Sequence, residues 1–161
     1  MSRGEVMLPK DVVRDDFESF LKENGERLVD GLTALFGPTV GSEAAADALS
    51  YCWEHWDRVR AMANPVGYLY VMARGRVRRA RGRRFLLLDP VDSQRAPWVE
   101  PGLPAALERL SEKQRVVVML IHCFQWSFKE VAEMMGISKG TVQLHERRAM
   151  RRLRSDLGVE A

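Results

Sequence analysis

Apolar side chains recur at steps of three and four residues through the first third of the chain. Over residues 17–36 this spacing forms one face of an amphipathic helix, which Gly37 and Pro38 end. A second such helix is predicted from Ser42, a residue type that favours the N-cap, to Val59. The chain therefore opens with two consecutive amphipathic helices.

The next stretch adds a third helix and then loses its periodicity. Asn64 and Pro65 make a favourable helix start, because Asn caps well and Pro is tolerated at the first helical position. This helix is predicted to run to about Arg84. Over residues 85–102 the pattern disappears and prolines interrupt the chain, which indicates an interdomain linker.

Two capping boxes open helices in the C-terminal third. Ser111 with Gln114 forms one and Ser127 with Glu130 the other, and in each pair the two side chains satisfy each other's backbone donors. No alternating run is long enough to predict a sheet. The predicted fold class is all-α, with an N-terminal helical bundle and a C-terminal helix-turn-helix domain joined by a linker.

The helix-turn-helix follows the second capping box. Small Ala132 allows the helices to cross closely, Gly136 gives the freedom that a sharp turn needs, and Val142 packs the second helix onto the first. Ser138 is placed to cap that second helix. Its exposed face is predicted to bind DNA through Lys139, Gln143, Leu144, Arg147, Arg148 and Arg151. The alternative is an ordinary helical hairpin with a solvated basic face.

The net charge of +3 is distributed unevenly. It resolves into −6 over residues 1–58, +8 over 59–84, −2 over 85–110 and +3 over 111–161. Such asymmetry predicts separate surfaces with different partners. In the basic segment 7 of the 11 residues from 74 to 84 are Arg, more than a helix C-terminus uses, which favours contact with a nucleic-acid backbone.

An aromatic and amide-containing turn precedes this basic helix. Residues 60–64 end in Asn64, and Tyr68 and Tyr70 follow. A π-face, an edge-reading amide and nearby cations are what a site for an unstacked base uses. Core packing is the alternative role for both tyrosines.

Composition excludes several classes of protein. The hydrophobic fraction of 46% is too high for a disordered chain, and the apolar runs are far shorter than the roughly 18 residues of a membrane span. No secretory signal is evident and Cys52 and Cys123 lie far apart, which fits a reducing, cytoplasmic setting. Zinc-type spacings, phosphate-binding glycine loops and nucleophile–base pairs are not found, so we expect no metal, no cofactor and no enzymatic activity.

The C-terminal pattern resembles region 4 of bacterial sigma factors, the domain that reads the minus-35 promoter element and docks on RNA polymerase. The resemblance is carried by Leu103-Pro104, Gly136-Ile137-Ser138, Gly140-Thr141-Val142 and Arg148-Ala149. The three residues 143–145, Gln-Leu-His, stand where the family usually shows Lys-Ser-Arg. The preferred promoter sequence is therefore not implied by the resemblance.

The N-terminal pattern WEHWDRV followed by NPVGYLYVMARGRVRR resembles region 2 of the extracytoplasmic-function class of sigma factors. In that family the loop captures a flipped base of the minus-10 element while the basic helix holds the opening DNA. The resemblance implies these roles for Arg60, Asn64, Tyr68, Arg74 and Arg78. It also implies that the preceding helix docks on the clamp of the polymerase β′ subunit through Asp47, Leu49, Ser50 and Glu54.

Together the two resemblances cover nearly the whole chain in the family's order. They imply a region 2-like domain at 12–85, a linker at 86–103 and a region 4-like domain at 104–157. The implied function is a cytoplasmic sigma factor that binds core RNA polymerase and promoter DNA, and no membrane. Whether an anti-sigma factor also binds is left open.

Two other functions stay open at the level of the sequence. Thr141, Val142 and His145 also resemble the LuxR-type helix-turn-helix, which would make the chain a stand-alone regulator of symmetric duplex sites. The departures from the family pattern at residues 47–51 and 143–145 suit a second alternative, a sigma mimic that sequesters a partner without supporting transcription.

Overall fold

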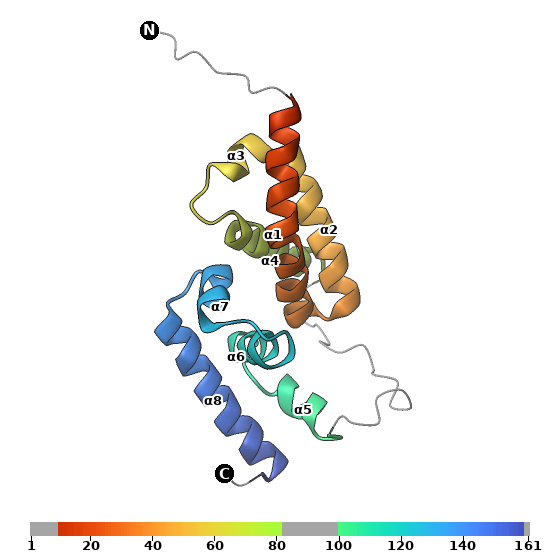
Figure 1. Cartoon of the computed structure of the whole chain (residues 1–161). Coiled ribbons are helices and arrows are strands. Elements are labelled where there is room, and N and C mark those ends of the chain that lie inside the picture. The colour runs from red at the N-terminus through yellow and green to blue at the C-terminus, as the bar shows by residue number, and fades with distance from the viewer. Residues whose placement is uncertain (1–9, 82–99, 160–161) are drawn as a thin grey trace.

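The computed structural model describes residues 10–81 and 100–159 of the chain. These two ranges fold into helices and contain no strand, which confirms the all-α fold class. Figure 1 shows an N-terminal group of helices stacked on a C-terminal group, with α8 running along one side of the C-terminal group. None of the described helices is long and apolar enough to cross a lipid bilayer.

The N-terminal group is built on a helical hairpin. Its helices are α1 (Lys10–Phe36), α2 (Pro38–Glu54), α3 (Trp56–Arg60) and α4 (Pro65–Arg81). The hairpin is tight because Gly41 has no side chain: a Cβ there would lie 2.6 Å from the Thr33 backbone. Helix α4 packs against both α1 and α2, and the three helices lie together in the N-terminal group of Figure 1.

The predicted start of the second helix at Ser42 is wrong. Helix α2 begins at Pro38, because Gly37 adopts a positive φ of 82° that reverses the chain directly after α1. Pro38 then occupies the first helical position, where its missing N–H costs nothing. Ser42 lies inside the helix and its hydroxyl donates to the Pro38 carbonyl at 2.5 Å.

The predicted continuity of this helix to Val59 is also wrong. The backbone leaves helical geometry at His55, with φ −121° and ψ 28°, and resumes as α3. The short helix brings Trp56 into the core, where its ring lies 5.3 Å from Phe17 and 5.2 Å from Phe20, both on α1. Burying this aromatic cluster favours the break over a straight helix.

The C-terminal group contains five helical segments: α5 (Leu103–Glu108), α6 (Glu112–Val118), the π-helical turn η1 (Met119–Cys123), α7 (Phe128–Met135) and α8 (Lys139–Leu157). Both predicted capping boxes are present, at Ser111 and at Ser127. Periodicity did not predict α5 or the change from α to π geometry at Met119. Of the predicted linker, 86–103, residues 86–99 lie outside the described residues.

One apolar core runs through both groups of helices. It includes Leu32 of α1, Tyr70 of α4, Leu120 of η1 and Met134 of α7, each at most 2% exposed. A smaller cluster joins α5 to α8 around Leu110 and other apolar side chains. The two helical domains are therefore packed directly on each other, along a surface that we call the seam, where α1 and α4 meet α6, η1 and α7.

Candidate nucleic-acid interface

Helix α8 is held by the turn chemistry that its sequence predicted. Gly136 ends α7 in the left-handed conformation at φ 65°, and the Ser138 hydroxyl then accepts the Thr141 N–H at 3.1 Å. Val142 and Ala149 are fully buried against the preceding helices. Leu153 is buried on the same side, so the opposite side of the helix is left to face outward.

All the residues predicted to form the recognition face are exposed on α8: Lys139, Gln143, Leu144, Arg147, Arg148 and Arg151. Of the three residues that depart from the family pattern, Gln143 and Leu144 face outward whereas His145 is partly buried. Burial, together with Lys113 and Arg148 nearby, lowers the pKa of His145. Its buried Nδ1 has no hydrogen-bond partner in the part of the chain that the structure describes. His145 is thus turned toward the helix packing and away from the exposed face.

Asn64 has two contacts at the start of α4. Its Oδ1 accepts the Gly67 N–H at 3.0 Å, which caps the helix as predicted, and its Nδ2 donates to the backbone carbonyl of Glu133 on α7 at 2.5 Å. The side chain folds over the helix end because residue 67 is glycine: a Cβ there would lie 2.4 Å from the Asn64 Nδ2. The cap could be predicted from the sequence, but the bond to Glu133 could not.

Arg74 and Arg78 point toward the C-terminal half. Both form ion pairs with the carboxylate of Glu112 at the first turn of α6, Arg74 at 3.9 Å and Arg78 at hydrogen-bond distance. Their spacing of four residues places them on one helix face, which is the signal that could have indicated a shared anionic partner. Arg83 and Arg84 lie outside the described residues.

Tyr68 belongs to a cluster that the sequence did not reveal. Its hydroxyl lies 3.3 Å from that of Tyr51 on α2, and this hydrogen bond, followed by burial, raises the pKa of Tyr68. The Tyr51 ring stacks on His55 at 4.2 Å, and the Arg76 guanidinium lies over the same ring at 4.9 Å. Tyr68 is half-buried, whereas Tyr70 is a core residue at 2% exposure.

Arg60 lies apart from the other predicted strand-holding residues. It ends α3 and forms an ion pair with Asp16 of α1 at 3.0 Å. The structure therefore brings Asn64, Arg74 and Arg78 to the seam, and leaves Arg60 and Tyr68 on other sides of the α3–α4 region.

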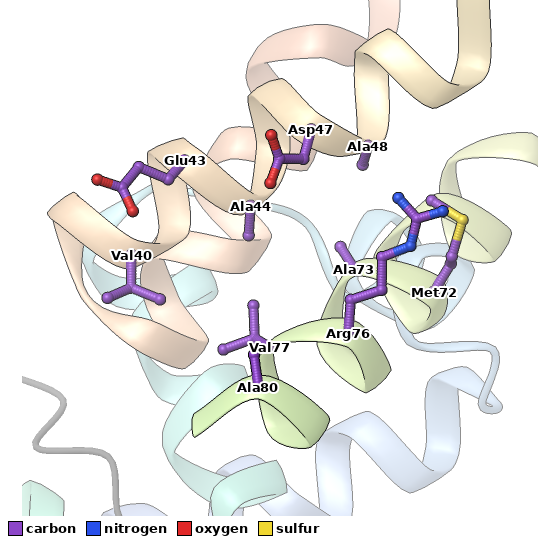
Figure 2. A pocket seen from close by; sticks show the side chains of 10 residues that line it. All are labelled: Val40, Glu43, Ala44, Asp47, Ala48, Met72, Ala73, Arg76, Val77 and Ala80. Carbon is purple, nitrogen blue, oxygen red and sulfur yellow. The ribbon is translucent and has the colours of Figure 1, made fainter. Parts of the chain in front are cut away.

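The predicted polymerase-binding residues do not all share one face of α2. Asp47, Ser50 and Glu54 are exposed at helical spacing, but Leu49 packs against the core. Asp47 also stands at the rim of a hollow of about 260 Å³ between α2 and α4. Figure 2 shows its floor of small apolar side chains, with Asp47 on one side and Arg76 on the other.

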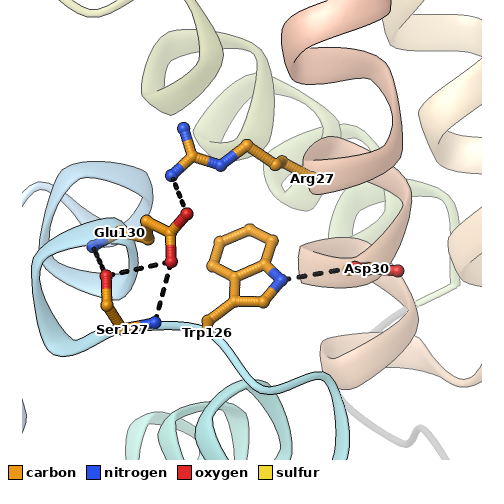
Figure 3. Close-up of polar contacts among 5 residues, drawn as sticks. All are labelled: Arg27, Asp30, Trp126, Ser127 and Glu130. Carbon is orange, nitrogen blue, oxygen red and sulfur yellow. Dashed lines mark hydrogen bonds and ion pairs between the residues drawn. The ribbon is translucent and has the colours of Figure 1, made fainter.

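A polar network joins α1 to the start of α7 across the seam, as Figure 3 shows. Arg27 of α1 pairs with Glu130 at 3.0 Å and lies 5.4 Å from the Trp126 ring, whose N–H donates to Asp30 at 3.3 Å. Hydrogen bonds from the Ser127 backbone and hydroxyl, with Arg27 nearby, lower the pKa of Glu130. Burial raises the pKa of Asp30 against the opposing bond from Trp126. The network therefore keeps the capping box of α7 tied to α1.

The described residues offer no group of three or more His, Cys, Asp or Glu side chains that could hold a metal ion. Three arginines of the N-terminal group, Arg27, Arg74 and Arg78, pair with glutamates of the C-terminal group across the seam. These arginines can bind the phosphates of a nucleic-acid strand when the phosphates replace the glutamates as their partners.

Comparisons with known proteins agree with this geometry. Residues 102–153 match the family described as Sigma-70, region 4. Along 98% of its length the chain is 30% identical to an RNA polymerase sigma-E factor of Streptomyces avermitilis, covering 89% of that protein. It is 29% identical to the factor of the same name from Streptomyces antibioticus, over 98% of this chain and 88% of that one.

A solved structure has a similar fold. It is the sigma factor RpoE of Bartonella quintana, in a co-crystal with the anti-sigma factor NepR. The TM-score is 0.60 at 21% identity, and the match covers 91% of this chain and 99% of the other. The likeness therefore spans both helical groups.

Proposed function

The chain belongs to the sigma-70 family of RNA polymerase sigma factors, in its extracytoplasmic-function class, and we propose that it binds core polymerase and directs promoter-specific initiation of transcription. The observation that carries the proposal is the pairing, in one chain, of an exposed basic recognition helix with an Arg-rich helix that starts at an Asn-capped turn. A stand-alone LuxR-type regulator would account for the recognition helix but not for the Arg-rich helix.

The exposed face of α8 is proposed to read the minus-35 duplex. A helix of this kind enters the major groove, where Arg suits guanine edges and phosphates and Gln suits adenine. Gln143, Arg147 and Arg148 are all exposed on one helix whose opposite face is fixed by Val142 and Ala149. This rigid support favours base reading over loose attraction to the phosphate backbone.

The start of α4 is proposed to capture a base of the minus-10 element. Extruding a base costs a few kcal/mol, and stacking with edge-reading hydrogen bonds offsets that cost. Asn64 supplies an amide at the seam, and Tyr68, one turn further along α4, supplies an aromatic ring on the side that faces α2. Arg74 and Arg78 extend along the same helix to neutralise strand phosphates. Strand opening on this account is base capture and involves no covalent step.

The exposed side chains of α2 are proposed to face the polymerase β′ clamp. Asp47, Ser50 and Glu54 share a face and stand outside the core, which supports their role. Leu49 then contributes by packing α2 in place.

We assign residues 12–85 to polymerase and minus-10 contacts, 86–103 to the linker and 104–157 to the minus-35 element, with all of these steps taking place in the cytoplasm. An anti-sigma factor is a further proposed partner, on the fold likeness to a sigma factor crystallised with one.

The proposal is tested by adding the purified chain to core polymerase from the host and performing run-off transcription on genomic fragments. We expect a stable complex with core on size exclusion and discrete transcripts that core alone does not produce. A complex without any promoter-dependent transcript would point instead to a sequestering mimic. Symmetric footprints on DNA without polymerase would favour the stand-alone regulator.

A further inference from the structure

The residues proposed to hold the opened DNA strand are engaged by the chain's own C-terminal half. The Asn64 amide donates to the Glu133 carbonyl of α7, and Arg74 and Arg78 pair with Glu112 of α6. Three of the four residues proposed to contact the strand therefore already have partners across the seam. A DNA strand cannot use the same atoms without displacing those partners.

The partners on the C-terminal side resemble a DNA strand in their chemistry. The Glu112 carboxylate presents oxygens to two arginines, as a backbone phosphate does. The Glu133 carbonyl accepts a hydrogen bond from the Asn64 amide, as the edge of an exposed base does. The face of α6 and α7 thus offers to α4 the acceptors that a single strand would offer.

The seam also has an apolar centre that holds this face in place. Tyr70 of α4 is 2% exposed, and a Cβ added at Gly31 of α1 would lie 3.4 Å from its ring and 3.6 Å from the Met134 methyl group of α7. Val117 and Leu120 are fully buried in the same cluster. The contacts of Arg74, Arg78 and Asn64 are therefore the polar edge of a packed interface, and opening that interface exposes apolar surface.

We propose that the chain carries its own competitor for single-stranded DNA: packing at the seam and binding of the minus-10 strand by α4 exclude each other. The inference rests on the proposed function of α4. The seam leaves the recognition face of α8 exposed, so the packed form can still bind duplex DNA while its strand-holding face is covered. The strand and the C-terminal half compete for the same atoms of α4. Seam packing weakens strand binding, and strand binding weakens seam packing by the same factor.

The direct test compares Glu112→Gln with a matched control, Glu133→Gln, in the full chain. Both remove one negative charge from the C-terminal half near the seam, but only Glu112 has a carboxylate paired with Arg74 and Arg78. Binding of a fluorescent single-stranded oligonucleotide of mixed sequence is measured by anisotropy. We expect Glu112→Gln to bind about threefold to tenfold more tightly than the wild type, because more of the chain is open, and Glu133→Gln to stay within twofold.

Opening is measured in the same samples by energy transfer between dyes on Ala46→Cys and Ser155→Cys, in a Cys123→Ser background. Both positions are exposed, on α2 and α8 respectively, and the remaining Cys52 is fully buried. Adding the oligonucleotide to this pair without any seam substitution should change the transfer efficiency. This readout does not depend on how well the Glu112→Gln variant folds.

The proposal is overturned if the oligonucleotide binds at saturation without changing the transfer efficiency. It is also overturned if a folded Glu112→Gln chain gains no more affinity for the single-stranded oligonucleotide than Glu133→Gln does. An equal gain in affinity for a duplex that only α8 binds would overturn it as well. These outcomes are separate from the fate of the proposed function. A chain that opens on single strands but never supports transcription with core polymerase keeps the seam inference and loses the sigma function.

Discussion

Asn64 joins a structural role to a proposed functional one, and two substitutions separate them. Asn64→Ala removes both the helix cap and the amide, whereas Asn64→Asp keeps an oxygen for the Gly67 N–H and loses only the amide donor. We expect both variants to impair promoter opening in permanganate footprints while duplex binding through α8 is unchanged. Both variants should lower the free energy of unfolding, because both lose the donor to the Glu133 carbonyl. The Ala variant should lose about 1 kcal/mol more, since it also loses the helix cap.

Core binding, measured in parallel, shows whether either variant still enters the polymerase complex. If Asn64→Asp opened promoters as well as the wild type does, the Asn64 amide would not be needed for base capture. The sequence could predict this residue as a cap because a cap is a local contact. It could not predict the Glu133 carbonyl as the second partner, since that atom lies 69 residues away along the chain.

His145 is expected to make stability depend on pH. Its pKa is lowered from the ordinary 6.5 by burial and by the nearby cations Lys113 and Arg148. The unfolded chain therefore takes up the proton first as the pH falls, so this contribution to stability is full above about pH 6.5 and is lost as the pH drops below it. Urea unfolding at pH 7.5 and 5.5 should show a smaller decline for His145→Gln than for the wild type. The other two histidines remain in the variant and serve as the internal reference, so equal declines would contradict the role given to His145.

At the scale of the elements, the turn before α8 depends on one glycine. Gly136 has a φ of 65°, so a side chain there is strained even though nothing lies within 4 Å of the added Cβ. Gly136→Ala should lower the free energy of unfolding by about 1–2 kcal/mol. The matched control is Gly140→Ala, in the helical first turn of α8, where the nearest atom to a Cβ is the Ser138 hydroxyl at 3.9 Å. Chemical denaturation should show no loss for the control, and a loss of equal size in both would contradict the turn argument.

The recognition face of α8 is tested by comparing two arginines of the same helix. Arg148 lies in the predicted face and Arg152 outside it, and both are exposed. Arg148→Ala should weaken discrimination among upstream duplex sequences by about 1–3 kcal/mol, whereas Arg152→Ala should reduce binding to all sequences slightly and uniformly. Competition between promoter fragments bound by the polymerase complex measures both. Equal loss of discrimination in the two variants would show that the face is assigned incorrectly.

Local chemistry decided which elements the sequence could predict. The capping boxes at Ser111 and Ser127 and the turn at Gly136 depend on neighbouring residues, and all three are found as predicted. The break at His55 depends on Trp56 reaching α1, and the close packing of α2 on α1 depends on the absence of a side chain at Gly41. Such features belong to tertiary packing, so periodicity along the chain could not resolve them.

At the scale of the whole molecule, the charge pattern predicted separate surfaces but not that two of them would meet. The ion pairs of Arg74 and Arg78 with Glu112, and the Trp126 contact with Asp30 across 96 residues, join halves that the sequence presents as independent domains. Apolar spacing shows which residues of a helix are buried. It does not show which helix buries them, and for that reason the continuous core through Tyr70 and Met134 appears only in the structure.

The central claim is that this chain directs polymerase to promoters, and mapping of transcript ends tests it most directly. Core polymerase with and without the chain would transcribe fragmented host DNA, and the 5′ ends would be sequenced. The account predicts start sites that appear only with the chain and share two sequence elements at a fixed separation, matching a duplex reader joined to a strand-holding helix. Transcript ends indistinguishable from those of core polymerase alone would contradict it.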